Sequence, residues 1–159
     1  MISRFLIACG VGALLGTATP LSAQDVGPPE ALVDALTQGA RVNLTKARLP
    51  DGSNVPAETP EELAQPIAPR ELEVQTIERA LLSAYMKTCD LDSEGLSFRP
   101  YMAALRASER YSEKQLAYIG VLHGFAMAWL GEGIDPSECN DALNKDMVRE
   151  VQEAIVATP

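Results

Sequence analysis

The apolar segment from Ser112 to Gly131 constrains the fold more than any other part of the sequence. Ser112 and Gln115 stand at the spacing of a capping box, which predicts a helix start, and Gly131 is placed to end that helix in a left-handed conformation. A helix with apolar residues on every face is typical of the buried centre of a helical bundle. The apolar positions are Leu116, Ala117, Tyr118, Ile119, Val121, Leu122, Phe125, Ala126, Met127, Trp129 and Leu130.

The apolar part of this segment, residues 116–130, is shorter than a membrane span. A span needs roughly 20 consecutive apolar residues, and His123 interrupts the segment. We therefore interpret it as a core helix and expect no membrane span in the mature chain.

Residues 1–23 have the pattern of a secretory signal peptide. Arg4 precedes an apolar region, and Leu21-Ser22-Ala23 has the small residues of a cleavage site. An alternative is a lipoprotein, because Leu6-Ile7-Ala8-Cys9 resembles a lipid-attachment box, but most of the apolar region would then follow the modified cysteine. The sequence predicts an exported protein, periplasmic or secreted after cleavage near Ala23.

The chain is acidic, with 13 basic and 22 acidic residues and a formal net charge of −9. Removal of residues 1–23 takes away Arg4 and no acidic residue, so twelve basic and 22 acidic residues remain and the mature net charge is −10. Nucleic acids and anionic membranes repel such a chain. We therefore expect another protein as the partner, although an acidic surface also serves solubility alone.

Two cysteines, Cys89 and Cys139, remain after Cys9 is removed with the signal. An even number of cysteines in an oxidising compartment favours a disulfide. Closure of the loop between them would stabilise the fold by roughly 4 kcal/mol in the chain-entropy model. Two cysteines alone do not form a structural zinc site. We predict a bond between Cys89 and Cys139.

Residues 24–68 are rich in proline and show no clear periodicity. Pro28-Pro29 predicts the start of a short helix that Gly39 ends, and Asp51-Gly52-Ser53-Asn54 has the composition of a turn. We interpret residues 24–68 as a loosely ordered arm or linker with a short helix. Its later prolines are Pro50, Pro56, Pro60 and Pro66.

Residues 69–157 form the predicted helical domain. Besides the central helix, helix starts are predicted after Pro69, at Phe98 with Ser97 as its cap, and at Asp135-Pro136-Ser137-Glu138. The last helix would carry Cys139 in its first turns and a break near Asn144. The predicted fold is all-α, a small four- to five-helix bundle around a buried central helix, with one disulfide and preceded by the arm.

The loop after Cys89 resembles part of a calcium-binding loop. Asp90, Asp92, Glu94 and Gly95 stand at positions one, three, five and six of such a loop, with a predicted helix on each side. Position twelve, which requires a bidentate carboxylate, is Tyr101. We therefore favour a solvated acidic loop, and we expect neither a metal nor a cofactor.

His123, the single histidine, lies between two glycines of the central helix. Gly120 and Gly124 leave room for the close approach of another helix or for a ligand or partner cleft. His123 is either a general base or pH switch, or a buried residue with one hydrogen-bond partner. The candidate cleft residues are Tyr118, Gly120, His123, Gly124, Phe125 and Trp129.

Several features resemble two groups of exported bacterial proteins. One group is the acid-stress chaperone HdeA and its relatives, and the other is the Rap/Tai-type immunity proteins of secretion systems. The features that are similar are a signal peptide, a small helical domain, two cysteines fifty residues apart, the Tyr118-Ile119-Gly120-Val121 segment, and Glu138-Cys139 before an amphipathic helix. The similarity extends over residues 81–155. The immunity proteins usually have an extra cysteine near the Tyr-Ile segment, where this chain has Ala117. The chain also resembles short secreted proteins of proteobacteria without assigned activity.

Two hypotheses follow. The first is a non-catalytic periplasmic or secreted protein-interaction module, such as a stress chaperone or an inhibitor or immunity-type binder, because the sequence shows no nucleophile-elbow serine and no hydrolase constellation. The alternative is a small enzyme or ligand-binding protein that uses His123 and the Gly120/Gly124 cleft.

Overall fold

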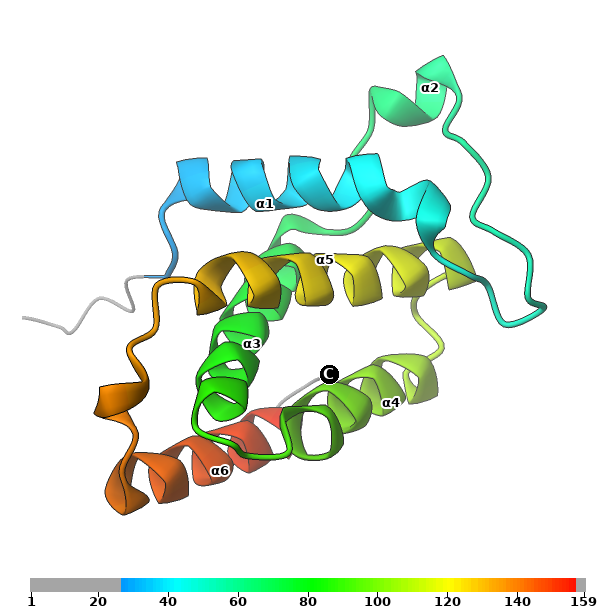
Figure 1. Cartoon of the computed structure of the whole chain (residues 1–159). Coiled ribbons are helices and arrows are strands. Elements are labelled where there is room, and N and C mark those ends of the chain that lie inside the picture. Colours follow the sequence, from blue (N-terminus) through cyan, green and yellow to red (C-terminus); the bar gives the residue numbers. More distant parts are fainter. Residues whose placement is uncertain (1–26, 157–159) are drawn as a thin grey trace, which may run out of the picture.

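The computed structural model describes residues 27–156, with side chains up to residue 153, and this part of the chain contains six α-helices and no β-strand (Figure 1). Since α2 is a single turn, the bundle consists of five longer helices, and the predicted all-α fold is confirmed. The predicted signal peptide lies outside the described residues. The helices are α1 (Glu30–Asn43), α2 (Pro60–Leu63), α3 (Arg70–Thr88), α4 (Arg99–Ala107), α5 (Glu113–Gly131) and α6 (Asp141–Val156), with the 3₁₀ turns η1 (Leu44–Lys46) and η3 (Pro136–Glu138) and the π-turn η2 (Glu94–Phe98).

Helix α5 occupies the centre of the bundle, between α1 on one side and α3 and α4 on the other (Figure 1). Its predicted start is confirmed, since the Ser112 hydroxyl accepts from the Gln115 amide at 3.3 Å and the Gln115 side chain accepts from the Ser112 amide at 3.0 Å. The helix is not enclosed on every side, because Trp129 is 53% exposed. None of the described helices is long and apolar enough to cross a membrane.

The predicted left-handed conformation of Gly131 is wrong. Among the described glycines a positive φ occurs at Gly52, with 84°, whereas α5 ends at Gly131 and is followed by Glu132 in a right-handed conformation. Gly131 instead faces α3, where a Cβ atom added to it would lie 3.7 Å from the Cβ of Ala84. This is an ordinary contact distance, so the packing of α5 on α3 does not require a glycine here.

Residues 30–68 are packed against the bundle, which corrects the interpretation of this part of the chain as a loosely ordered arm. Helix α1 lies along α5 (Figure 1), and it continues through Gly39 to Asn43. A Cβ atom at Gly39 would overlap the ring of Phe125, so this glycine permits close contact between the two helices and does not end α1. The core residues from this region are Val33, Leu36, Ala40, Leu44, Val55 and Ala68.

Helix α4 differs from its prediction at its first turn. The chain enters it through the π-turn η2, and α4 itself begins at Arg99. Ser97, predicted as a helix cap, is instead fully buried within η2, where its hydroxyl accepts from the hydroxyl of Ser83 at 2.8 Å. A π-turn places one extra residue in a helical turn, and here it directs the Ser97 side chain into the core.

Helix α6 begins later than predicted. Asp135-Pro136-Ser137-Glu138 forms only the 3₁₀ turn η3, in which the Asp135 carboxylate accepts from the Ser137 amide at 2.8 Å. The cap of α6 is Asn140, whose side-chain oxygen accepts from the Leu143 amide at 3.0 Å. Cys139 therefore precedes α6, and the helix continues without a break at Asn144.

The predicted disulfide between Cys89 and Cys139 is confirmed, with a Cα–Cα distance of 5.4 Å. Cys89 follows the last residue of α3 and Cys139 lies just before α6, so the bond joins these two elements. Helix α6 contributes to a second, smaller core in which Met86, Met147 and Val151 are buried. The partly buried residues around this core are Leu82, Tyr85, Cys89, Leu91, Leu96, Leu143 and Val148.

The contact between α1 and α5 yields a first prediction. The variant Gly39→Val should lower the free energy of unfolding by about 1–3 kcal/mol, because the added methyl groups displace Phe125 from a packed interface. The matched control is Gly124→Ala, where an added Cβ meets nothing within 4 Å and the better helix propensity of alanine should stabilise the protein by up to about 1 kcal/mol. Urea unfolding measures both, and equal effects of the two variants would contradict this account of the interface.

Candidate functional site

The six residues of the predicted cleft do not line one cavity. Gly120 lies in an open groove, His123 is only 3% exposed, and Phe125 contacts Gly39 of α1. Trp129 and Gly124 are on the surface, and Tyr118 is buried against α3. The structure therefore separates these residues into five environments: a buried pair at Tyr118, a polar core at His123, a groove at Gly120, the α1–α5 contact at Phe125 and the surface at Gly124 and Trp129.

Tyr118 is paired with a buried carboxylate. Its hydroxyl donates to Glu73 of α3 at 2.7 Å, and the Arg70 guanidinium lies 3.6 Å from the other carboxylate oxygen of Glu73. Burial, and then the hydrogen bond to Glu73, raise the pKa of Tyr118 above its usual range. The pair borders an open cavity of about 420 Å³ beside α1, but the phenol and carboxylate already satisfy each other.

His123 belongs to a polar core shared by α3, α5 and η2. Its Nε2 atom lies 3.0 Å from the hydroxyl of Ser83, which in turn lies 2.8 Å from the hydroxyl of Ser97. The ring of Phe98 covers the imidazole, with the two ring centroids 4.6 Å apart. His123 therefore has the hydrogen-bond partner that a buried imidazole requires.

Arg79 is the charged member of the same core. The residue is 5% exposed, donates from Nη1 to the carbonyl of Val151 in α6 at 3.0 Å, and lies over the ring of Tyr101, with Cζ 5.4 Å from the centroid. The Tyr101 hydroxyl is bonded to Thr76 at 2.7 Å. Arg79 forms no ion pair with a carboxylate of the described residues; the Val151 carbonyl, the face of Tyr101 and, at longer range, the charge of Glu150 offset its charge.

The electrostatics of this core oppose protonation of His123. Burial, and then the charge of Arg79, lower the pKa of His123 to about 4. Burial also lowers the pKa of Arg79. Ser83, which is bonded to the imidazole, Ser97, which is bonded to Ser83, and Phe98, which lies against the imidazole ring, carry no charge. An imidazolium here would be buried close to the Arg79 cation, so this arrangement disfavours protonation.

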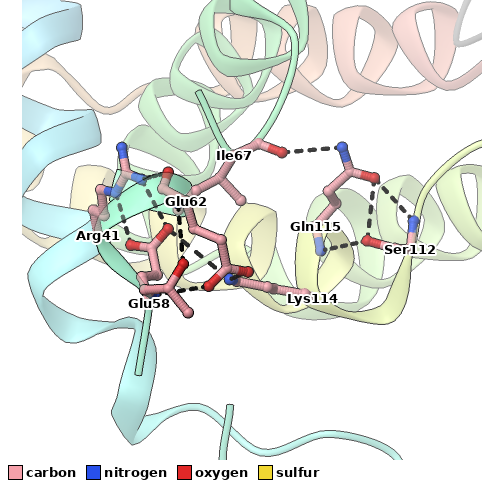
Figure 2. A network of polar contacts seen from close by, with 8 residues as sticks. Arg41, Glu58, Glu62, Ile67, Ser112, Lys114 and Gln115 are labelled. Atoms are coloured by element: carbon pink, nitrogen blue, oxygen red, sulfur yellow. Dashed lines mark hydrogen bonds and ion pairs between the residues drawn. The ribbon is translucent and has the colours of Figure 1, made fainter. Parts of the chain in front are cut away.

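A network of ion pairs fixes residues 55–68 to α1 and α5 (Figure 2). Arg41 donates to both carboxylate oxygens of Glu58, at 2.7 and 2.8 Å, and Lys114 donates to Glu62 at 2.6 Å. The Gln115 side chain donates to the carbonyl of Ile67 at 3.0 Å. Each charge in the network has a partner, which indicates a structural role.

The Gly120 groove is a cavity of about 560 Å³ between residues 47–50, α4 and α5. Arg48, Arg106 and Glu113 carry its charged groups. Most of the remaining lining is apolar, with Leu49, Phe98, Met102, Leu116, Ala117 and Gly120 among these residues. Phe98 thus contacts the groove on one side and His123 on the other.

Asp90, Asp92 and Glu94, the weak candidates for calcium ligands, have other roles in the structure. The Asp92 carboxylate accepts from the Gly95 amide at 2.8 Å, and Glu94 accepts from Arg99 at 3.2 Å. Asp90 adopts a left-handed conformation with φ of 57°. The described residues contain no group of three or more His, Cys, Asp or Glu side chains that could hold a metal ion.

Comparisons with protein-family models, with curated proteins and with solved structures found no match for this chain.

The environment of His123 yields a pH prediction. Its pKa of about 4 in the folded protein lies below the ordinary value of 6.5, so the unfolded chain binds the proton more readily. Stability should be highest above pH 6.5 and fall by about 3 kcal/mol as the pH drops from 6.5 to 4. Because His123 is the only histidine, its NMR titration is unambiguous.

The control for this titration is His123→Gln, which keeps a hydrogen-bonding group but does not ionise. This variant should lose the part of the pH dependence between 6.5 and 4. A measured pKa near 6.5 for His123, or the same pH dependence in the variant, would contradict the burial argument.

Proposed function

We propose that the protein is a non-catalytic, exported interaction module that binds other proteins in acid through the apolar surface that α6 covers at neutral pH. The observation that carries the proposal is the polar core in which His123 lies close to Arg79, which is buried and forms no ion pair with the described side chains. Arg79 is bonded to the backbone of α6 at Val151, so the charge state of this core acts on the position of α6.

Acid adds a second cation to this core. The imidazolium of His123 would be poorly hydrated and close to Arg79, and a buried charge without a counterion is unfavourable. Displacement of α6 relieves this cost, because water then reaches both cations. The packing that opposes displacement is limited, since Met86, Met147 and Val151 are the fully buried apolar residues of this small core.

The surface beneath α6 suits contacts with varied proteins. It presents methionine and leucine side chains, including Met86, Leu82 and Leu96, and methionine adapts to irregular apolar partners. The Cys89–Cys139 bond keeps α6 attached to the end of α3. A displaced α6 would therefore return to its place when the pH rises.

The end of the bundle near α2 loses its stabilising ion pair at a lower pH than the α6 end. The hydrogen bond from Lys114 is the main cause that lowers the pKa of Glu62 below its ordinary value of 4.5. The stabilisation from this pair is present above pH 4.5 and is lost only as the pH falls through the lowered pKa of Glu62. The α6 end should therefore open first on acidification.

A dye-binding experiment tests the proposal. Fluorescence of a dye that binds apolar surface, and suppression of aggregation of an acid-denatured client protein, should both rise as the pH falls from 6.5 to 4. His123→Gln should shift both responses to lower pH. The matched control Glu61→Gln alters an exposed carboxylate of α2 and should leave them unchanged.

The disulfide supplies a second arm of this experiment. Reduction of Cys89–Cys139 should leave the acid response in place but decrease recovery of the folded state on return to pH 7. Flat dye binding and no suppression between pH 7 and 3 would remove the proposed function.

A further inference from the structure

The Gly120 groove is preformed. Residues 47–50 form one wall, and backbone hydrogen bonds from Leu49 to Ser53 at 2.8 Å and from Val55 to Ala47 at 3.0 Å hold this segment in place. The volume of about 560 Å³ lies within the range of sites that enclose small molecules, roughly 300–1,000 Å³. The groove therefore offers a shaped cavity without a rearrangement of the fold.

Gly120 leaves the floor of the groove open. A Cβ atom added there would meet Phe98 at 3.9 Å, an ordinary contact distance, and no closer atom. Glycine inside a helix costs stability relative to alanine, and packing against another helix does not require it at this position. The absent side chain leaves space above an apolar floor that Leu116 and Ala117 also form.

The two cations at the groove lack carboxylate partners. Arg106 forms no hydrogen bond or ion pair with a described side chain, and the Arg48 guanidinium donates only to the carbonyl of Gly52, at 3.2 Å. Arg41, Arg70, Arg99 and Arg149 are all paired with Asp or Glu. In a chain with net charge −9, two available arginines beside an apolar cavity favour an anionic group on the ligand.

We infer that the Gly120 groove binds a small amphipathic anion, an alkyl chain that ends in a carboxylate. The alkyl chain lies over Leu116, Ala117 and Gly120, and the carboxylate faces Arg48 and Arg106. Glu113, the acidic residue of the lining, repels an anionic headgroup and so weakens the site for the carboxylate. It does not repel an uncharged or cationic headgroup, so its effect distinguishes these headgroups from an anionic one. This inference is independent of the proposed acid response, since it requires neither His123 nor the displacement of α6.

The test is a calorimetric titration of the full mature chain with decanoate at pH 7. The decanoate concentration stays below that at which micelles form. Binding should saturate at one decanoate per chain and exceed that of decanol and of decylamine by tenfold or more. Each methylene added between octanoate and decanoate should tighten binding about fourfold. Equal affinity for decanoate and decanol, or no saturable binding, would overturn the inference.

Variants locate the ligand in the groove. Gly120→Leu fills the floor and should abolish binding, whereas the matched control Gly120→Ala, which fits at ordinary contact distance, should retain most of it. Arg106→Gln and Arg48→Gln should remove the preference for decanoate over decanol. Glu113→Gln should tighten decanoate binding, an effect that a loss of folding does not mimic.

Circular dichroism checks that each variant is folded. Unchanged binding in a folded Gly120→Leu variant would show that decanoate binds elsewhere, and would also overturn the inference. Binding of wild-type strength in both arginine variants would contradict the assigned headgroup.

Discussion

Helix α3 has to satisfy polar side chains inside an otherwise apolar bundle, and the arrangement of the other helices depends on how it does so. Glu73 bonds to Tyr118 of α5, Thr76 to Tyr101 of α4, and Arg79 to the Val151 carbonyl of α6. Ser83 is bonded to both His123 and Ser97. A buried polar group without a partner costs about 1–3 kcal/mol. These partners therefore specify one packing of α4, α5 and α6 around α3, where apolar contacts alone would accept several.

The two ends of the bundle are held by different interactions. Near α2, the Arg41–Glu58 and Lys114–Glu62 pairs and the close contact of Gly39 with Phe125 fix α1 and residues 55–68 to α5 (Figure 2). At the other end, α6 is held by a small core, by one hydrogen bond from Arg79 and by the disulfide. The proposed acid response depends on this asymmetry, because a charge at His123 would then act on α6 before it acts on α1.

Local signals were sufficient for part of this structure. The Ser112–Gln115 capping box acts within four residues, and the pairing of Cys89 with Cys139 follows once Cys9 is set aside, so both were predictable. The core role of α1 was harder to predict. Val33, Leu36 and Ala40 recur at helical spacing, but the prolines that follow suggested a linker, and Gly39 looked like a helix end. Only the position of Phe125, 86 residues further along the chain, explains that glycine.

The candidate sites depended still more on contacts between distant residues. His123 and Gly120 were identifiable from α5 alone, but nothing local shows that Arg79 is buried beside His123, because charged helix residues usually face solvent. The groove likewise combines Arg48 with Arg106, which are brought together only by the fold.

The position of the disulfide also determines which parts of the chain stay joined after cleavage of the backbone. Cys89 and Cys139 are 50 residues apart, and the covalent ring that they close contains η2, α4, α5 and η3. A protease that cuts once within this ring, for instance in the exposed turn at Glu109 and Arg110, leaves both fragments linked through sulfur. A cut before Cys89 frees the N-terminal piece. Resistance to fragment loss is thus confined to the half of the molecule that contains α5.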